Sequence, residues 1–219
     1  MSKVTELPSS QLGTKEYWDN QYEHELTNFE NHGDIGEIWF EDSMDKVLQW
    51  VLDTDLVTTQ SSVIDIGCGN GAFLLNLAAE GFTNLYGIDY SQKAIKLAQA
   101  VAAQKEANIT YKHFDIINPD GESLVPNEYD LCHDKGTYDA ISLCPDDPSG
   151  KRAAYVKAVH HMTRQDGIFL IISCNWTQEE LVEQFSEYFM VEHIIPMPTF
   201  MFGGKVGSRV TSIAFKKKI

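Results

Sequence analysis

Hydrophobic positions follow two kinds of pattern along this chain: short continuous runs and repeats at helical spacing. Each change from one pattern to the other indicates the boundary of a predicted element. Short continuous apolar runs predict buried strands, at residues 62–66, 84–88, 109–114, 129–133 and 167–173. Apolar residues at helical spacing predict helices around these strands, at residues 42–52, 72–80, 91–106, 150–162 and 177–187. Because strands and helices alternate, we expect a parallel sheet covered by helices on both faces.

The end of the chain departs from this alternation. Two more strands are predicted at residues 190–195 and 210–215 with no helix between them, which indicates an antiparallel hairpin at the sheet edge. The predicted fold class is α/β: a doubly wound, Rossmann-like seven-stranded sheet, mostly parallel with an antiparallel edge strand and flanked by helices. Ser43 is the predicted cap of the first helix, and Thr177 with Glu180 forms a predicted capping box.

Residues 1–43 are polar, but six aromatic residues interrupt them between Tyr17 and Phe40. So many aromatic side chains favour a segment that packs on a folded body over a free tail. We therefore divide the chain into an N-terminal lead-in or lid, residues 1–43, and the domain on which it packs, residues 44–219.

The composition is that of a globular protein, with 43% hydrophobic and 22% charged residues. The formal net charge is −15, and residues 1–60 carry −10 of it, since they hold 13 acidic and three basic side chains. A nucleic-acid substrate requires a basic face, so this charge disfavours one and favours a basic partner. No apolar run approaches the ~18 residues of a membrane helix, so we expect no membrane association.

The four cysteines are Cys68, Cys132, Cys144 and Cys174, and they form no C-x-x-C pair and lack a histidine at metal-ligand spacing. We expect free thiols in a reducing compartment and no metal site. The first residues show no secretory signal, so the predicted location is cytoplasmic.

The first strand ends in Asp65 and runs into the loop Gly67-Cys68-Gly69-Asn70-Gly71. Glycines allow positive φ and let a nucleotide approach the backbone closely. The loop also fits the dinucleotide fingerprint G-x-G-x-x-A, with Asp89 about 20 residues further on as the ribose acid. However, Asp65 would repel a pyrophosphate, and it suits a ligand that carries an ammonium and a sulfonium.

The string D-x-G-x-G-x-G is typical of class I S-adenosylmethionine-dependent methyltransferases, so we predict S-adenosylmethionine as cofactor and S-adenosylhomocysteine as product. Every residue of the glycine loop and Asp65 would then contact the cofactor. Asp89 would hold the ribose hydroxyls, and Tyr90 would lie beside the adenine. Asp115 would accept a hydrogen bond from the adenine amino group, and Ile116 would offer its backbone N–H.

The fourth strand leads into the string HDKGTYD at residues 133–139, where the transferred methyl is expected. This string differs from the (Asn/Asp)-Pro-Pro-(Tyr/Phe) of enzymes that methylate planar amides or adenine. Cys144-Pro145 has the reverse of the Pro-Cys order used in attack on cytosine C5. Both chemistries are therefore excluded.

Longer strings resemble the elongation factor 1-alpha lysine methyltransferase 2 family, at residues 13–19 (GTKEYWD), 36–40 (GEIWF), 65–67 (DIG), 134–143 (DKGTYDAISL) and 173–177 (SCNWT). The resemblance covers nearly the whole chain, from about Leu12 onward. It implies N-methylation of a lysine on translation elongation factor 1-alpha. We expect this partner to be recognised as a folded protein by a monomeric enzyme.

Only about one lysine in a thousand is neutral near pH 7.4, and a water-poor aromatic slot lowers the pKa of the amine. The candidates for that slot are Trp39, Phe40, Tyr138 and Trp176, and Asp134 or Asn175 would orient the amine. The predicted catalytic residues are therefore Asp134, Tyr138, Asn175 and Trp176, and Trp39 and Asp134 are also expected to reach the cofactor.

Alternatives remain open at this stage. The two tryptophans at positions 39 and 176 could pack in the core, and Asp134 could bind the methionine amino group or cap a turn. The chain could also be a small-molecule methyltransferase with residues 1–43 as its lid. A non-catalytic binding module is disfavoured because Asp89 and the glycines are intact.

Overall fold

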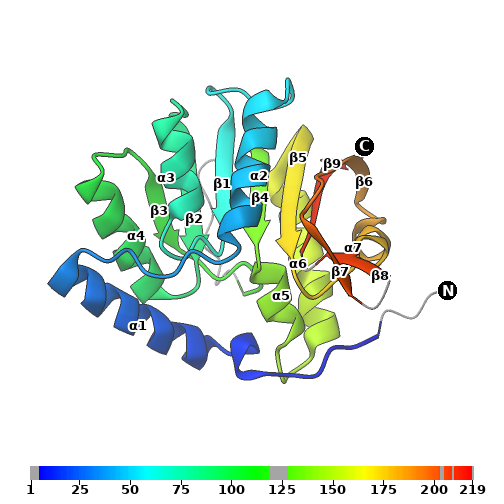
Figure 1. The fold of residues 1–219 in the computed structure, drawn as a ribbon, viewed down its shortest axis with the longest axis horizontal. Helices are drawn as coiled ribbons and strands as arrows, with labels where there is room; N and C mark the ends of the chain where they lie inside the picture. Colours follow the sequence, from blue (N-terminus) through cyan, green and yellow to red (C-terminus); the bar gives the residue numbers. More distant parts are fainter. Residues whose placement is uncertain (1–4, 119–127, 203–204, 209, 219) are drawn as a thin grey trace.

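The computed structural model describes residues 5–118, 128–202, 205–208 and 210–218. Over these residues the chain forms a seven-stranded sheet in the order β3-β2-β1-β4-β5-β9-β6 and a separate two-stranded sheet, β7-β8 (Figure 1). The first five strands of that order are parallel, and β9 is antiparallel to both of its neighbours. The predicted fold class is confirmed.

The predicted strands and helices are present with small shifts of their ends. The strands are β1 (Ser62–Ile66), β2 (Asn84–Asp89), β3 (Thr110–His113), β4 (Tyr129–Lys135), β5 (Thr163–Ser173), β6 (Phe189–Ile194), β7 (Thr199–Phe202), β8 (Lys205–Ser208) and β9 (Thr211–Lys217). The helices are η1 (Gln11–Gly13), α1 (Lys15–His32), α2 (Glu41–Asp53), α3 (Ala72–Ala79), α4 (Gln92–Gln104), α5 (Thr137–Ser142), α6 (Pro148–Met162) and α7 (Gln178–Phe185).

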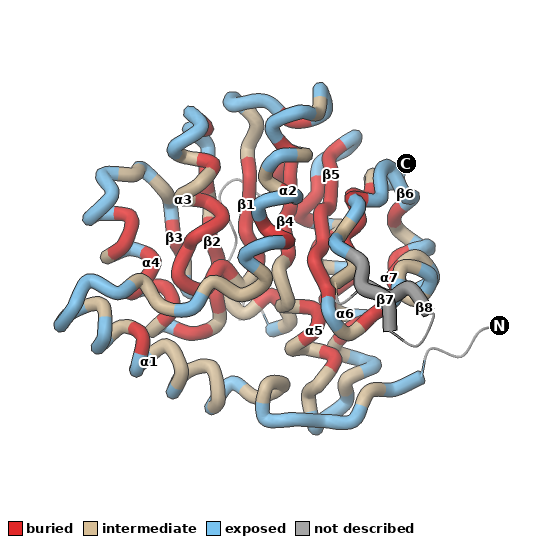
Figure 2. Tube along the Cα trace, viewed as in Figure 1, coloured by how far each residue is buried: buried red, intermediate tan, exposed pale blue. Residues whose placement is uncertain are grey.

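Successive strand residues point into two hydrophobic cores, one on each face of the sheet. Val63 and Leu131 pack with α2, α3 and α4, whereas the next residue in each strand, Ile64 or Cys132, packs with α6 and α7 on the other face. Figure 2 shows the buried residues concentrated in β1, β4 and β5 between these helical layers. Burial on both faces explains why these strands appear in the sequence as continuous apolar runs.

The closing strands pair as predicted, because β6 and β9 are antiparallel neighbours. The antiparallel strand β9 lies one position inside the sheet edge, which β6 occupies. The hairpin β7-β8 lies between them in the chain and was not predicted.

The predicted capping box at Thr177 and Glu180 is confirmed, since both reciprocal hydrogen bonds are present. The predicted helix at residues 42–52 is present as α2, but its predicted cap was wrong. Phe40 is its N-cap, with φ 58° and no side-chain cap bond, and Ser43 lies buried inside the first turn. The helix begins earlier because two acidic residues of its first turn suit the positive helix N-terminus.

Residues 15–32 of the lead-in form a helix that the hydrophobic pattern did not predict. Helix α1 begins at the cap Thr14 and ends at Gly33, whose φ is 72°. It packs along α4, where Asp19 accepts a hydrogen bond from Ser91 at 2.7 Å. Figure 1 shows α1 lying across the lower ends of the sheet strands. Its aromatic residues face the domain, but they are too few to give the sequence the continuous apolar stripe from which an amphipathic helix is predicted.

The segment before α1 also contacts the domain. Glu6 accepts two hydrogen bonds, at 2.6 and 3.0 Å, from Arg152 of α6, which is 6% exposed. The backbone N–H of Ser10 donates to the carbonyl of Leu143 at 3.1 Å, and a Cβ on Gly13 would overlap the Leu143 backbone. This close packing explains the glycine at position 13.

Candidate active site

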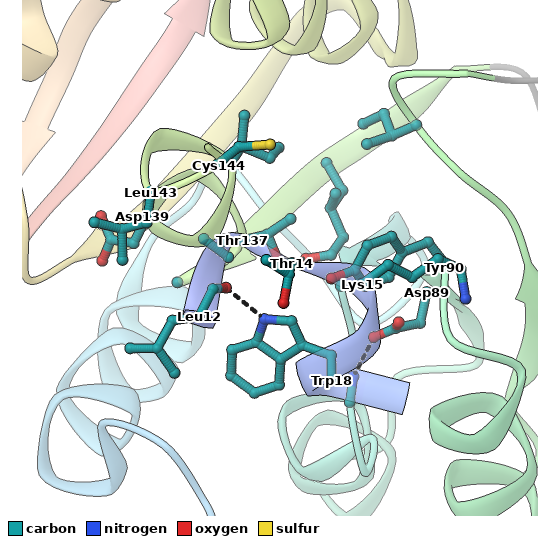
Figure 3. Close-up of a pocket in the computed structure, with 18 of the residues that line it drawn as sticks. Leu12, Thr14, Lys15, Trp18, Asp89, Tyr90, Thr137, Asp139, Leu143 and Cys144 are labelled. Carbon is teal, nitrogen blue, oxygen red and sulfur yellow. Dashed lines mark hydrogen bonds between the residues drawn. The ribbon is translucent and has the colours of Figure 1, made fainter. Parts of the chain in front are cut away.

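A cavity of about 490 Å³ lies between the carboxyl ends of the strands and the lead-in. The loops after β1, β2, β3, β4 and β5 all contribute to its lining, and η1 and α1 line it from the other side. Figure 3 shows Trp18 of α1 and Asp89 of β2 in this cavity, with Thr137 and Cys144 from the α5 region. The ligand site expected from the strand ends is therefore a cleft with two walls of different origin.

The glycine turn after β1 forms the floor of the cavity through residues 67–70. Gly67 and Gly69 have φ of 67° and 54°, in the left-handed region that favours glycine. A Cβ on Gly69 would lie 2.6 Å from the hydroxyl oxygen of Tyr22, and one on Gly67 would overlap the Thr137 hydroxyl. The hydroxyl groups of Tyr22 and Thr137 therefore leave no room for a side chain at either position, so the turn faces the cavity with backbone atoms alone.

Asp89 is 5% exposed and lines the cavity where β2 ends. Its carboxylate accepts hydrogen bonds from the backbone N–H groups of Gly69 at 3.1 Å and Ser91 at 2.8 Å. Burial raises the pKa of Asp89 to about 6, although these two donors oppose the shift. A carboxylate has about four lone-pair sites, so acceptor capacity remains for the hydroxyls of a ligand.

The residues predicted for the adenine end also line the cavity. They are Tyr90, Asp115 and Ile116. The Lys15 ammonium lies 5.4 Å from the centre of the Tyr90 ring. The carboxylate of Asp115 accepts hydrogen bonds from two backbone N–H groups of its own loop, those of Ile117 and Asn118, so part of its capacity stabilises that loop.

The lead-in supplies an aromatic wall of Trp18, Tyr22, Trp39 and Phe40. The Trp18 ring centroid lies 5.5 Å from that of Trp39 and 6.0 Å from that of Tyr22, and its Nε1 donates to the Leu12 carbonyl at 2.7 Å (Figure 3). Trp39 and Phe40 were predicted, whereas Trp18 and Tyr22 were not. Their spacing of four residues would have placed them on one helix face had the helix been recognised.

Of the predicted catalytic residues, Asn175 lines the cavity, together with its neighbour Cys174. Asp139 also lines it and was missed. Its carboxylate accepts hydrogen bonds from the Ser173 hydroxyl at 2.5 Å and the Cys174 N–H at 2.7 Å. Burial raises the pKa of Asp139 above its ordinary value. The Asp139 carboxylate therefore fixes the turn that presents Asn175.

The structure does not bring Asp134, Tyr138 or Trp176 to the cavity lining. Asp134 is fully buried and accepts the backbone N–H groups of Thr137 and Tyr138 and the hydroxyl of Tyr155, so it caps α5. Its complete burial outside the cavity lining opposes the expected contact with amine or cofactor, and its three donors match the alternative of a turn cap.

The two aromatic side chains in this group belong to the core. Tyr138 is 1% exposed and donates to Gln184 at 2.7 Å, and Trp176 is 3% exposed and donates to Ser142 at 3.0 Å. The aromatic side chains that do line the cavity include Trp18 and Tyr22 of α1.

Asp65 also lies below the cavity surface. Its carboxylate is 2.7 Å from Nδ1 of His133, a fully buried residue of β4 whose ring stacks on Phe73 with centroids 3.7 Å apart. A direct contact of Asp65 with a cationic ligand is therefore corrected to a buried Asp–His pair beneath the glycine turn. Gly71, with φ 79°, also lies outside the lining, because the Tyr111 hydroxyl occupies the space beside it.

S-Adenosylmethionine fits this arrangement. The positive-φ glycines Gly67 and Gly69 line the cavity at the end of β1 without side chains, and the Asp89 carboxylate at the end of β2 has acceptor sites for ribose hydroxyls. The strand order and the position of these residues define the class I S-adenosylmethionine-dependent methyltransferases.

Comparison with known proteins agrees with this class. Residues 58–214 match a family described as "Methyltransferase domain". The chain is 44% identical to mouse "EEF1A lysine methyltransferase 2" over 99% of its own length and 88% of that protein. It is 45% identical to the human protein of the same name over 96% and 88%. It is 38% identical to the Saccharomyces cerevisiae "Protein-lysine N-methyltransferase EFM4" over 100% of both chains. The chain belongs to this EEF1A lysine methyltransferase 2 family.

Solved structures with low sequence identity share the fold. The N-methyltransferase NodS of Bradyrhizobium japonicum, solved with S-adenosylhomocysteine, has a TM-score of 0.65 at 16% identity, over 91% of this chain and 98% of that one. The magnesium protoporphyrin IX methyltransferase of Synechocystis, solved with bound S-adenosylmethionine, has a TM-score of 0.60 at 15% identity, over 90% and 97%. Within the described part of the chain, none of the helices is long and apolar enough to cross a membrane.

Proposed function

We propose that this chain is an S-adenosylmethionine-dependent protein-lysine N-methyltransferase that modifies a lysine of translation elongation factor 1-alpha. One observation carries the proposal. The general methyltransferase family matches residues 58–214, whereas the relatives named as lysine methyltransferases match 96–100% of the chain. The part of the chain outside that family match includes the lead-in, which supplies the aromatic wall of the cavity.

The residues of the cavity support transfer to an amine. The cofactor supplies a methyl group already activated by its sulfonium. Indole and phenol rings of Trp18, Tyr22 and Trp39 exclude water from their side of the cavity, which favours the neutral form of a lysine amine. The same rings accommodate a methylated ammonium by cation–π attraction. Alignment of the amine with the methyl then supplies most of the rate acceleration.

Asn175 is the residue we propose to orient the amine, because its backbone and side-chain oxygens are acceptors at the cavity surface. Asp139 acts through the turn at residues 173–175, and its buried carboxylate adds negative potential near the amine. Both residues follow β4 or β5, on the side of β1 opposite to the adenosine residues of β2 and β3. The cofactor and the lysine would thus enter from different ends of the cavity.

We propose that residues 1–43 act as a lid that closes over the cofactor and shapes the lysine channel. The contacts of Glu6 with Arg152 and of α1 with α4 support a lid that is held at both ends. We further propose a monomeric enzyme in the cytoplasm, for which the four free cysteines suit a reducing compartment.

The test incubates purified chain and S-adenosylmethionine with folded elongation factor 1-alpha, followed by mass spectrometry of its peptides. We expect methyl groups on one lysine, and none with Asp89→Ala. A parallel panel of small metabolites tests the alternative of a small-molecule methyltransferase. Methylation of a metabolite with no transfer to the folded factor would overturn the proposal.

A further inference from the structure

Asn70 of the glycine turn has a buried side chain, 8% exposed, that hydrogen-bonds within the protein. Its Nδ2 donates to the carbonyl of Ile35 at 3.1 Å and to that of Glu37 at 3.3 Å. Its Oδ1 accepts the backbone N–H of Ala72 at 3.2 Å, where α3 begins. A side-chain amide can donate two hydrogen bonds, so the lead-in takes the donor capacity of Asn70.

The segment that receives these hydrogen bonds, residues 34–39, lies between α1 and α2 and carries Trp39 of the aromatic wall. Figure 1 shows the chain returning along this segment from the end of α1 to α2. Within the described residues the segment makes no backbone–backbone hydrogen bond. Secondary structure therefore does not fix its conformation, and side chains from other elements must do so.

Some of those side chains belong to the lead-in itself. Glu25 of α1 fills the space beside Gly36, and the Trp39 ring lies 5.5 Å from the Trp18 ring of α1. From the domain, the core that contains α2 packs against Ile38. Apolar packing is non-directional, so it sets the depth of the segment better than its register.

The directional link between the segment and the domain is Asn70. In the part of the chain that the structure describes, the hydrogen bonds from residues 44–219 to residues 34–39 are the two that Asn70 donates. The other polar anchors of the lead-in, Glu6 with Arg152 and Asp19 with Ser91, come earlier in the chain. The position of Trp39 relative to the glycine turn is therefore set by one side chain of that turn.

We propose that Asn70 is a positioning residue for methyl transfer, which fixes Trp39 in the cavity by holding the two carbonyls that precede it. This inference rests on the proposed function, because it takes Trp39 to shape the lysine channel. The turn then serves both walls of the cavity. Its backbone lines the side where the strands end, and the Asn70 side chain sets where the opposite, aromatic side lies.

The first test measures the segment without a protein substrate. Asn70→Ser keeps an oxygen that can accept the Ala72 N–H, but its side chain is too short to reach both carbonyls. A glutamate-specific protease should cut after Glu37, which is exposed, at least about fivefold faster in this variant, because losing two hydrogen bonds makes local opening more frequent. Mass spectrometry identifies the cut, and thermal unfolding verifies that the variant is folded at the temperature used.

Asn84→Ser is the matched control. Asn84 also donates from its side-chain amide to a loop carbonyl, that of Gln60 at 2.8 Å, but it lies at the start of β2 and does not line the cavity. This variant should leave the rate of the cut after Glu37 unchanged. An equal rate in wild type and Asn70→Ser would overturn the proposal.

The second test measures the reaction on folded elongation factor 1-alpha. Asn70→Ser should lower kcat/KM about tenfold and S-adenosylhomocysteine affinity by less than about threefold. In a Trp39→Ala background the same substitution should change kcat/KM by less than about twofold, since its effect passes through that ring. The same loss in both backgrounds would overturn the proposal. If wild type transfers no methyl group, the proposed function fails, whereas the protease test still decides whether Asn70 holds the segment.

Discussion

The two walls of the cavity differ in their residue types and in how deeply their side chains are buried. The wall formed by the strand ends combines five loops between residues 66 and 175, is rich in glycine and acidic residues, and is held by buried backbone hydrogen bonds such as those of Asp89. The wall formed by the lead-in comes from α1 and the segment before α2, and its aromatic rings are only half-buried. The first wall can bind a nucleotide-like cofactor in any enzyme of this fold. The second wall is the part that can be specific to a protein substrate.

The largest expected effect is on the strand-end wall. Gly69→Arg should weaken S-adenosylhomocysteine binding by more than about 100-fold, because the side chain must displace Tyr22 and fill the turn at an unfavourable φ. Calorimetry and thermal unfolding measure the two effects separately. Gly81→Ala is the control, since Gly81 has φ 88° but no atom within 4 Å of its Cβ position. It should cost about 1 kcal/mol of stability and leave affinity unchanged. Undiminished binding by Gly69→Arg would refute the assignment of this wall.

The next effect separates the two walls. Trp18→Ala should lower methyl transfer to the folded protein by about 10-fold, through loss of the ring contacts with Tyr22 and Trp39. It should change S-adenosylhomocysteine affinity by less than about threefold, because Trp18 donates its hydrogen bond to Leu12 rather than to the glycine turn. Trp50→Ala is the control, since Trp50 stacks on His193 and does not line the cavity. A loss of affinity as large as the loss of transfer would show that the walls do not divide their roles.

A change of pH should act on the strand-end wall through Asp89. The pKa of Asp89 is raised to about 6, so its ionised form disappears as the pH falls below that value. We expect S-adenosylhomocysteine affinity to fall about tenfold between pH 7.5 and pH 5, and Asp89→Asn to bind weakly with a flat profile. A raised pKa means that the folded state holds this proton more tightly. The contribution of Asp89 to stability therefore grows as the pH falls from about 6 toward 3.8, so protonation of Asp89 does not itself unfold the chain. Thermal unfolding at each pH measures the contribution of the other carboxylates.

The smallest effect concerns the acidic surface of the lead-in. Glu16 and Glu30 on α1 are exposed, so Glu16→Lys with Glu30→Lys should raise KM for the folded factor about threefold at low salt. The effect should shrink as salt shortens the screening length below ~8 Å. Glu183→Lys with Glu192→Lys makes the same charge change on α7 and β6, at the opposite end of the sheet (Figure 1). Equal effects of the two pairs would show that net charge alone is responsible.

Charge reversal must avoid Glu25, which also lies on α1. Glu25 is 6% exposed, and it fills the space beside Gly36. Burial raises its pKa, and Gln21 donates to its carboxylate at 3.0 Å. Its place among the acidic residues of the lead-in is therefore structural, which composition does not reveal.

Cavity residues whose position follows from a single strand–turn–helix unit were predictable from the sequence. The glycine turn, Asp89 and Tyr90 lie on the cavity because strand, turn and helix follow one another within a few residues, and parallel strands end at one edge. The same reasoning placed Asp65 and Asp134 at strand ends but could not assign their partners. Asp65 faces His133, which is 68 residues away in the chain, and this pairing depends on β1 lying beside β4.

Sequence pattern was sufficient for the α/β class, the strand ends that carry the ligand residues and the cofactor that suits them, because burial period and turn chemistry are local properties. Long-range packing sets which buried polar groups satisfy one another and which aromatic rings line the cavity. A buried carboxylate or tryptophan has the same local pattern whether it caps a helix, fills a core or faces a ligand. The packing of α1 on α4 brought Trp18 and Tyr22 to the cavity, and the short helix α5 turned Asp134 away from it.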